Sequence, residues 1–222
     1  MSPSRSPQCR RSSIKATPLP RLSPLARLVR SAILGWFRGG GWTVAGTRPI
    51  DAKFILMGAP HTSNWDFLVF LGTVEGFAIR PRFMGKDGLF RWPMKGLMEG
   101  LGGVPVDRSA PGDMVEQVVA QFAAHDEFAL IIAAEGTRDP TVRWRTGYYR
   151  IALAAGVPIV CAGPDYDRKI GILGPRIVPT GDYETDMAPA WAFFRTLVPR
   201  HPERVLFPDG HGMVLPQAAD GL

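Results

Sequence analysis

Short apolar runs alternate with helical segments along the chain, and this alternation most constrains the fold. Three of the runs have the length of a buried strand and are bounded by glycine, proline or polar residues, at 54–57, 128–133 and 157–162. Helical patterns lie beside them, at 64–76, 113–124 and 146–155. Strands that alternate with helices indicate a largely parallel sheet. The sequence therefore predicts an α/β fold, with a mostly parallel central sheet flanked by helices.

Weaker patterns complete the expected order of elements. The other expected strands are short, at 42–45 (a first pair with 54–57), 82–86, 103–106, 170–173 and 176–178, the last two being edge strands. Residues 89–101 are expected to be helical or irregular, with a break at Pro93. A last helix covers 184–198, where Pro189 marks a start or a kink.

The length and composition of the chain suit a single domain. It has 222 residues, of which 45% are hydrophobic, enough for one full core. We expect this domain to cover residues 24–200, between a disordered Ser-, Pro- and Arg-rich tail at 1–23 and a C-terminal tail at 201–222. Cys9 and Cys161 are the two cysteines, which indicates no disulfide framework and fits a reducing compartment.

Charge is unevenly distributed along the chain. The net charge is +6, but residues 1–50 contain nine basic residues and no acidic one, and the other 17 basic and 20 acidic residues leave the remainder at −3. This pattern excludes a uniformly basic nucleic-acid binder and indicates a near-neutral domain with a cationic front end. Such a front end suits an anionic membrane surface and, less well, nucleic acid. The alternatives are a solvated tail, or an organelle transit peptide with the same Arg- and Ser-rich character.

An amphipathic helix is expected over residues 24–37, with Ser23 as its cap and Pro24 at its first position. Arg27 and Arg30 lie on one side; the apolar side consists of Leu25, Leu28, Val29, Ala32, Ile33 and Trp36. This pattern is typical of a helix in a membrane interface, although a helix packed on the core has the same pattern. No apolar run approaches the roughly 20 residues that span a bilayer. We therefore expect a peripheral, monotopic protein on the cytoplasmic face of a membrane.

The first chemically informative stretch is His61-Thr-Ser-Asn-Trp-Asp66, directly after a predicted strand. Its cap-forming residues place Asp66 in the first turn of a helix. Side chains five residues apart diverge on a continuous helix, so His61 and Asp66 meet only if the histidine lies outside the helix and the turn folds back. A histidine held by a carboxylate can act as a general base. The alternative is a capping histidine beside an unrelated first-turn charge.

The second stretch is Glu135-Gly136-Thr137-Arg138, at the end of another buried strand. Gly136 lets the backbone turn sharply and approach a ligand. Ligands on parallel sheets bind at the carboxyl ends of strands, and a guanidinium there suits a phosphate. The alternative is an ordinary Glu–Arg pair on the surface.

Three shorter pieces accompany these stretches. Gly85-Lys86 lacks the spacing of a nucleotide-binding P-loop. The segment 102–108 is a strand end that carries Arg108, and Val157-Pro158-Ile159 begins a buried strand.

In this order, the five pieces resemble the glycerophospholipid acyltransferase family, which includes the 1-acylglycerol-3-phosphate acyltransferases. That family shows His-x4-Asp, an arginine after a glycine-containing strand, Glu-Gly-Thr-Arg and a Val-Pro-Ile segment, and all four occur here between His61 and Val160. The resemblance covers about the middle half of the chain. The chain departs from the family at Pro60, often asparagine there, and at Asp139, serine in many members. A carboxylate beside Arg138 puts a phosphate-bearing acceptor in question.

The resemblance implies an O-acyltransferase of phospholipid synthesis, which moves a fatty acyl group from acyl-CoA or acyl carrier protein to a lysophospholipid hydroxyl, such as that of 1-acylglycerol-3-phosphate. It assigns His61 as the base, Asp66 as its orienting carboxylate, Glu135 to orient the turn or the acceptor, and the Gly136 backbone to the oxyanion. The substrate-binding residues that it implies are Lys86, Arg108, Thr137 and Arg138.

No metal and no cofactor besides the acyl donor is expected, because His125, His201 and His211 lack paired metal-ligand spacing. Three alternatives remain: an acyltransferase acting on a non-phosphate aminolipid or glycolipid, a thioester or lipid hydrolase, and a non-catalytic lipid-binding module.

Overall fold

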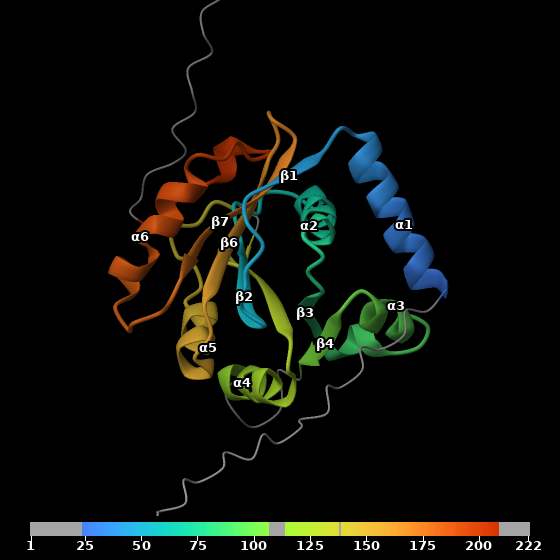
Figure 1. The fold of residues 1–222 in the computed structure, drawn as a ribbon, viewed down its shortest axis with the longest axis horizontal. Helices are drawn as coiled ribbons and strands as arrows, with labels where there is room; N and C mark the ends of the chain where they lie inside the picture. Colours follow the sequence, from blue (N-terminus) through green and yellow to red (C-terminus); the bar gives the residue numbers. More distant parts are fainter. Residues whose placement is uncertain (1–23, 107–113, 138, 209–222) are drawn as a thin grey trace, which may run out of the picture.

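One twisted sheet organises the molecule (Figure 1). The computed structural model describes residues 24–106, 114–137 and 139–208. Within them, seven strands pair in the order β1-β7-β6-β2-β5-β3-β4, and all neighbours are parallel except β6 and β7. The strands are β1 Thr43–Ala45, β2 Lys53–Gly58, β3 Pro81–Lys86, β4 Gly103–Val106, β5 Phe128–Ala133, β6 Ile159–Asp165 and β7 Ile170–Ile177. The expected α/β fold with a mostly parallel sheet is confirmed.

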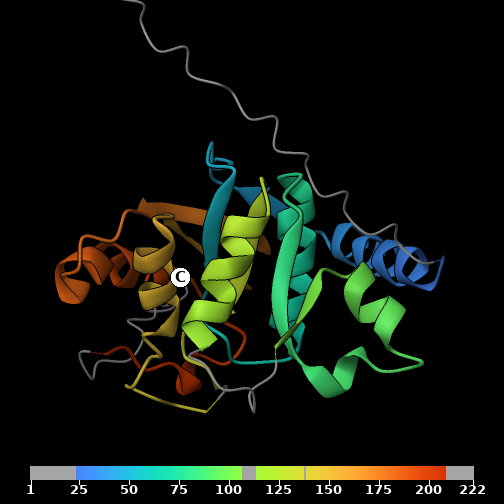
Figure 2. The same cartoon turned by 90° about the horizontal axis from the view of Figure 1, so that it is seen from below.

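Helices cover both faces of the sheet, which explains why the middle of β2 and the whole of β6 are buried and why both strands are mostly apolar. The helices are α1 Pro24–Gly39, α2 Trp65–Gly76, α3 Lys95–Gly100, α4 Met114–Ala124, α5 Gly147–Ala155 and α6 Tyr183–Phe194, with 3₁₀ turns η1 Asp87–Phe90 and η2 Pro202–Arg204. Helices α4, α5 and α6 share the larger core cluster with β2, β5 and β6. On the opposite face, α2 packs Val74 against Phe54 and Leu56. Helix α1 lies outside α2 (Figure 2).

Two expectations about the strands were wrong. Residues 170–173 and 176–178 are not two edge strands, because 170–177 is the single strand β7, which lies between β1 and β6. The Gly174-Pro175 pair falls where the β6–β7 register shifts between Val160 and Ala162, and such a bulge accommodates a proline inside a sheet. Strands β1 and β2 also do not pair with each other, because β7 and β6 lie between them.

Helix α1 packs on the domain and still exposes apolar residues. Ala26 and Phe37 are buried, and Phe37 shares a cluster with Val69 of α2. Leu25 and Leu28 are 55% and 67% exposed. The helix therefore packs on the core through one side and leaves apolar side chains exposed on another. The predicted cap, Ser23, lies outside the described residues together with the rest of the 1–23 tail.

The packed part of the chain continues beyond position 200, because Val205 and Phe207 are buried in the larger core cluster. Cys161 is a free, buried cysteine, whereas Cys9 lies outside the described residues. Across the described ranges, none of the helices combines the length and apolar character that crossing a membrane requires.

Candidate active site

Two neighbouring strands carry the two informative stretches to the same edge of the sheet. Strands β2 and β5 run parallel in register, with Gly58 opposite Ala133 at their carboxyl ends. The turn that holds His61 leaves β2, and the turn that holds Glu135 leaves β5. The backbone N–H of His61 donates to Glu135 Oε1 at 2.8 Å, so the two turns are directly joined. Ligand sites of parallel sheets lie at this edge.

The turn after β2 folds back, as the five-residue separation of His61 and Asp66 required for the two side chains to meet. His61 lies outside α2, and its Nδ1 is 3.5 Å from Oδ2 of Asp66, the second residue of that helix. The same Oδ2 accepts the backbone N–H groups of Thr62 and Ser63 at 2.7 Å each. Asn64 makes no side-chain cap. The carboxylate of Asp66 therefore both closes the turn and faces the imidazole.

Burial and charge suit a base backed by a carboxylate. The side chain of Asp66 is 5% exposed, whereas that of His61 is 24% exposed. Burial alone would raise the pKa of Asp66, but the hydrogen bonds from His61, Tyr166 and the turn outweigh it and lower that pKa. Asp66 is therefore ionised at neutral pH. With Nδ1 facing this carboxylate, Nε2 of His61 is the nitrogen available to accept a proton.

The turn after β5 is built around a buried acid and a left-handed glycine. Burial raises the pKa of Glu135 to about 7, and its Oε2 has no hydrogen-bond partner among the described residues. Gly136 has φ +67°, and a Cβ there would lie 2.7 Å from Cγ of Arg145. Glycine is thus required both by the backbone conformation and by the close approach of a neighbouring side chain. This leaves the backbone of the turn accessible, because Gly136 is exposed.

The remaining predicted substrate-binding residues are only partly described. The hydroxyl of Thr137 accepts the backbone N–H of Asp139 at 3.2 Å within the same turn. Lys86 is the last residue of β3, and its side chain is not among those described. Arg108 and Arg138 lie outside the described residues. The structure therefore brings together His61, Asp66, Glu135, Gly136 and Thr137.

Two residues at this edge were not predicted from the sequence. The hydroxyl of Tyr166 donates to Asp66 Oδ1 at 2.6 Å across 100 residues. Arg145, whose backbone N–H donates to the Ala134 carbonyl at 2.9 Å, lays its side chain against Gly136. For Tyr166 a signal existed, because it directly follows a buried strand that ends at the same sheet edge. Arg145 lies in an irregular segment that gave no comparable signal.

A cavity of about 360 Å³ lies away from this edge, between α1, α2 and the start of β3. Its lining includes Leu34, Leu71 and Arg82 and none of the predicted site residues. The His61–Asp66 pair, called the dyad below, lies at the start of helix α2, and the cavity lies near the other end of that helix. Among the described residues, no three His, Cys, Asp or Glu side chains form a group that could hold a metal ion.

Comparisons with known proteins bear on the family and the fold of this chain. A family model described as Acyltransferase matches residues 42–163, a range that contains both turns. The structure is similar to that of the 1-acyl-sn-glycerophosphate (LPA) acyltransferase PlsC from Thermotoga maritima, with a TM-score of 0.54 and 18% identity over 77% of this chain and 79% of that chain. At that identity the likeness concerns the fold. A comparison with curated protein sequences found no match. The family model spans more than half of the chain, and the chain belongs to the Acyltransferase family.

Proposed function

We propose that this enzyme moves a fatty acyl group from a thioester, acyl-CoA or acyl carrier protein, to the free hydroxyl of a lysophospholipid, with 1-acylglycerol-3-phosphate as the expected acceptor. The observation that carries the proposal is the His61–Asp66 pair, whose imidazole is accessible on one side and held by a buried carboxylate on the other. The similar fold of an enzyme described as an LPA acyltransferase supports this choice of acceptor.

The reaction needs no covalent enzyme intermediate. Nε2 of His61 takes the proton of the acceptor hydroxyl while that oxygen attacks the thioester carbonyl carbon. The C–S bond of the resulting tetrahedral intermediate then breaks, and the leaving thiolate receives the proton from the imidazolium. Asp66 stabilises that imidazolium and fixes its orientation. Backbone N–H groups around Gly136 are the proposed donors to the oxyanion, since the turn is exposed and carries no side chain there.

The acceptor headgroup is proposed to bind beside the turn after β5. Thr137 lies in that turn, and Arg145 places a cation against Gly136. A guanidinium offers paired N–H donors to a phosphate. Lys86, Arg108 and Arg138 remain the further phosphate ligands that the resemblance implies.

The test is a headgroup panel with one acyl donor. Purified protein is incubated with radiolabelled acyl-CoA or acyl carrier protein and with lysophosphatidic acid, other lysophospholipids, aminolipids or glycolipids. We expect the fastest transfer to lysophosphatidic acid. His61→Ala should keep the fold and lose about 10²- to 10⁴-fold in kcat, the usual contribution of a general base. Turnover of His61→Ala at the wild-type rate would refute the mechanism.

One observation favours a second candidate, an acceptor without phosphate. Asp139 donates its backbone N–H to Thr137 and adds an exposed carboxylate to the same turn. A carboxylate there repels a phosphate and attracts a cationic headgroup. Preferred transfer to an aminolipid in the panel would identify this acceptor class. Release of free fatty acid without any acceptor would identify a hydrolase instead.

We also propose that the enzyme works on an anionic membrane surface as a peripheral protein. Helix α1 carries Arg27, Arg30 and Arg38 and no acidic residue, and Leu25 and Leu28 point away from the core. Basic residues beside exposed apolar ones suit an interface rich in anionic lipids. The acceptor and the product of the proposed reaction are themselves membrane lipids.

A further inference from the structure

The catalytic carboxylate is held on both of its oxygens. Oδ2 faces His61 and accepts two backbone N–H groups of its own turn. Oδ1 accepts the Ser63 hydroxyl at 3.2 Å and the Tyr166 hydroxyl at 2.6 Å. The contact from Tyr166 is thus the shorter one on Oδ1, and it comes from a strand 100 residues away. A carboxylate is planar, so a donor that fixes Oδ1 also fixes the direction of Oδ2.

Tyr166 is itself firmly placed. It follows the last residue of β6, and its backbone N–H donates to the Val198 carbonyl at 2.8 Å. Its ring meets Trp42 edge-on, with centroids 5.1 Å apart, and Trp42 stacks in turn on Phe37 of α1. Burial and the Asp66 carboxylate raise the pKa of Tyr166, so the hydroxyl keeps the proton that it donates.

We propose that Tyr166 is a positioning residue of the dyad, whose hydroxyl sets the rotation of the Asp66 carboxylate and so keeps Oδ2 on the Nδ1 side of His61. The proposal rests on the proposed function, in which His61 is the base. Removing the hydroxyl should raise the pKa of Asp66 in either case, since the hydrogen bond favours the ionised carboxylate. A merely structural tie between β6 and α2 would affect the free energy of unfolding and leave kcat of the folded variant unchanged, so a loss of kcat at constant KM separates the two roles.

Several charged groups near Asp66 and Tyr166 also influence the titration of Asp66. His61 and Glu135 face Asp66 from the two catalytic turns, and Arg200, after α6, acts on Tyr166. A hydrogen bond to the charged form of a carboxylate favours that form. Removing the hydroxyl should therefore make Asp66 take up a proton at a higher pH.

The first test is Tyr166→Phe, which removes one oxygen and keeps the packed ring. The titration of the Asp66 carboxyl carbon is followed by NMR and assigned by its absence in Asp66→Asn. We expect the midpoint to rise on the order of one pH unit. In the acyl-transfer assay we expect kcat to fall about tenfold and KM for donor and acceptor to stay unchanged.

The matched control is Tyr183→Phe, which removes a hydroxyl that contacts Tyr148 at 3.0 Å, away from the dyad. It should leave the Asp66 titration and kcat as in the wild type. An equal change in this control, or an unchanged midpoint or unchanged kcat in Tyr166→Phe, would overturn the proposal.

A second variant decides the case if Tyr166→Phe does not fold. Replacing Tyr166 with 3-fluorotyrosine keeps the hydroxyl but makes it a stronger donor, so the Asp66 midpoint should move to lower pH. An unchanged midpoint contradicts the positioning role. The NMR measurement needs no substrate, so it separates this proposal from the proposed function, which fails if the wild type transfers no acyl group.

Discussion

Glu135 is a buried acid of the candidate site. Its burial raises its pKa to about 7, and the His61 N–H that it accepts only partly offsets that effect. Between its ordinary pKa of 4.5 and pH 7, the folded protein therefore holds a proton here that the unfolded chain has released. Folding stability falls with rising pH wherever the folded state binds more protons. The stability that depends on protonated Glu135 is fully present below the pKa of this residue in the unfolded chain. It is lost as pH rises through the pKa of this residue in the folded protein.

Glu135→Gln should remove this pH dependence, because glutamine keeps an oxygen for the His61 N–H and does not titrate. The free energy of unfolding of the wild type, relative to that of the variant, should fall by roughly 3 kcal/mol between pH 4.5 and pH 8. Urea unfolding of both proteins across this range measures the difference. A constant difference between the two would show that Glu135 titrates normally in the folded protein.

The sequence predicted the residues of the site better than their contacts. The pairing of His61 with Asp66 was predictable because both residues belong to one local turn. Their spacing of five residues would separate the side chains on a continuous helix, so the turn had to fold back for them to meet. The bond between the His61 N–H and Glu135 joins residues 74 apart, and no local pattern encodes it. Tyr166 follows a buried strand, but its contact with Asp66 was missed because that contact depends on β6 lying next to β2.

At the scale of elements, the close packing of α1 on α2 depends on a glycine. A Cβ at Gly72 of α2 would lie 2.2 Å from the ring of Phe37. Gly72→Ala should therefore lower the free energy of unfolding by about 1–3 kcal/mol, the usual cost of overpacking. Chemical denaturation monitored by tryptophan fluorescence measures the change.

Gly35 of α1 provides the control for this prediction. An added Cβ there meets no atom within 4 Å, and alanine favours a helix over glycine by about 1 kcal/mol. Gly35→Ala should therefore be neutral or stabilising. Destabilisation by both substitutions would mean that the two helices do not pack as described.

The elements themselves were predictable where local pattern decides them. The central strands β2, β5 and β6 were recognised because burial on both faces makes each of them a nearly continuous apolar run. Strand β7 was divided in two because Gly174-Pro175 usually marks a turn, whereas here a bulge accommodates it. The position of β1 was missed because β7, its partner in the described part of the sheet, lies more than 120 residues away.

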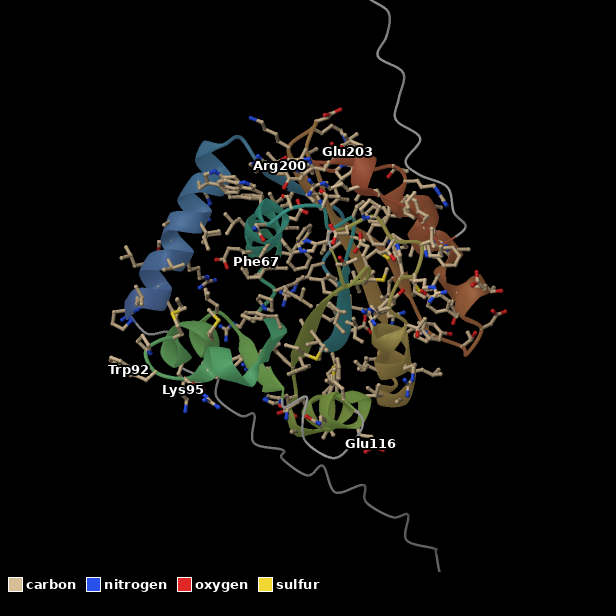
Figure 3. The ribbon with its side chains drawn as sticks, turned by 180° about the vertical axis from the view of Figure 1, so that it is seen from behind. Phe67, Trp92, Lys95, Glu116, Arg200 and Glu203 are labelled. Carbon is tan, nitrogen blue, oxygen red and sulfur yellow. The ribbon has the colours of Figure 1, made fainter. Side chains whose placement is uncertain are left out.

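At the scale of the molecule, one side combines exposed apolar residues with positive charge. Trp92, in the segment before α3, is 92% exposed and points away from the body near the start of α1 (Figure 3). Helix α1 contacts α3, the helix that follows Trp92 in the chain. At the other end of α1, Trp36 packs on Trp65, which is the neighbour of Asp66 and lies under Arg200. A membrane that lies along α1 would therefore extend from Trp92 to Trp65, beside Asp66.

This arrangement predicts how the protein binds vesicles. Burying one large apolar side chain contributes about 1.5–3 kcal/mol, so Leu28→Ser with Trp92→Ser should weaken sedimentation with phosphatidylglycerol-containing vesicles by about tenfold or more. Ile50, 96% exposed between β1 and β2, supplies the control, and Ile50→Ser should bind as the wild type does. Added salt should weaken binding of the wild type and the double variant alike, because it screens the arginines of α1 and leaves apolar burial intact. If Ile50→Ser lost as much binding as the double variant, the membrane contact would not be on the side of α1, and the dyad would have to receive its lipid by another route.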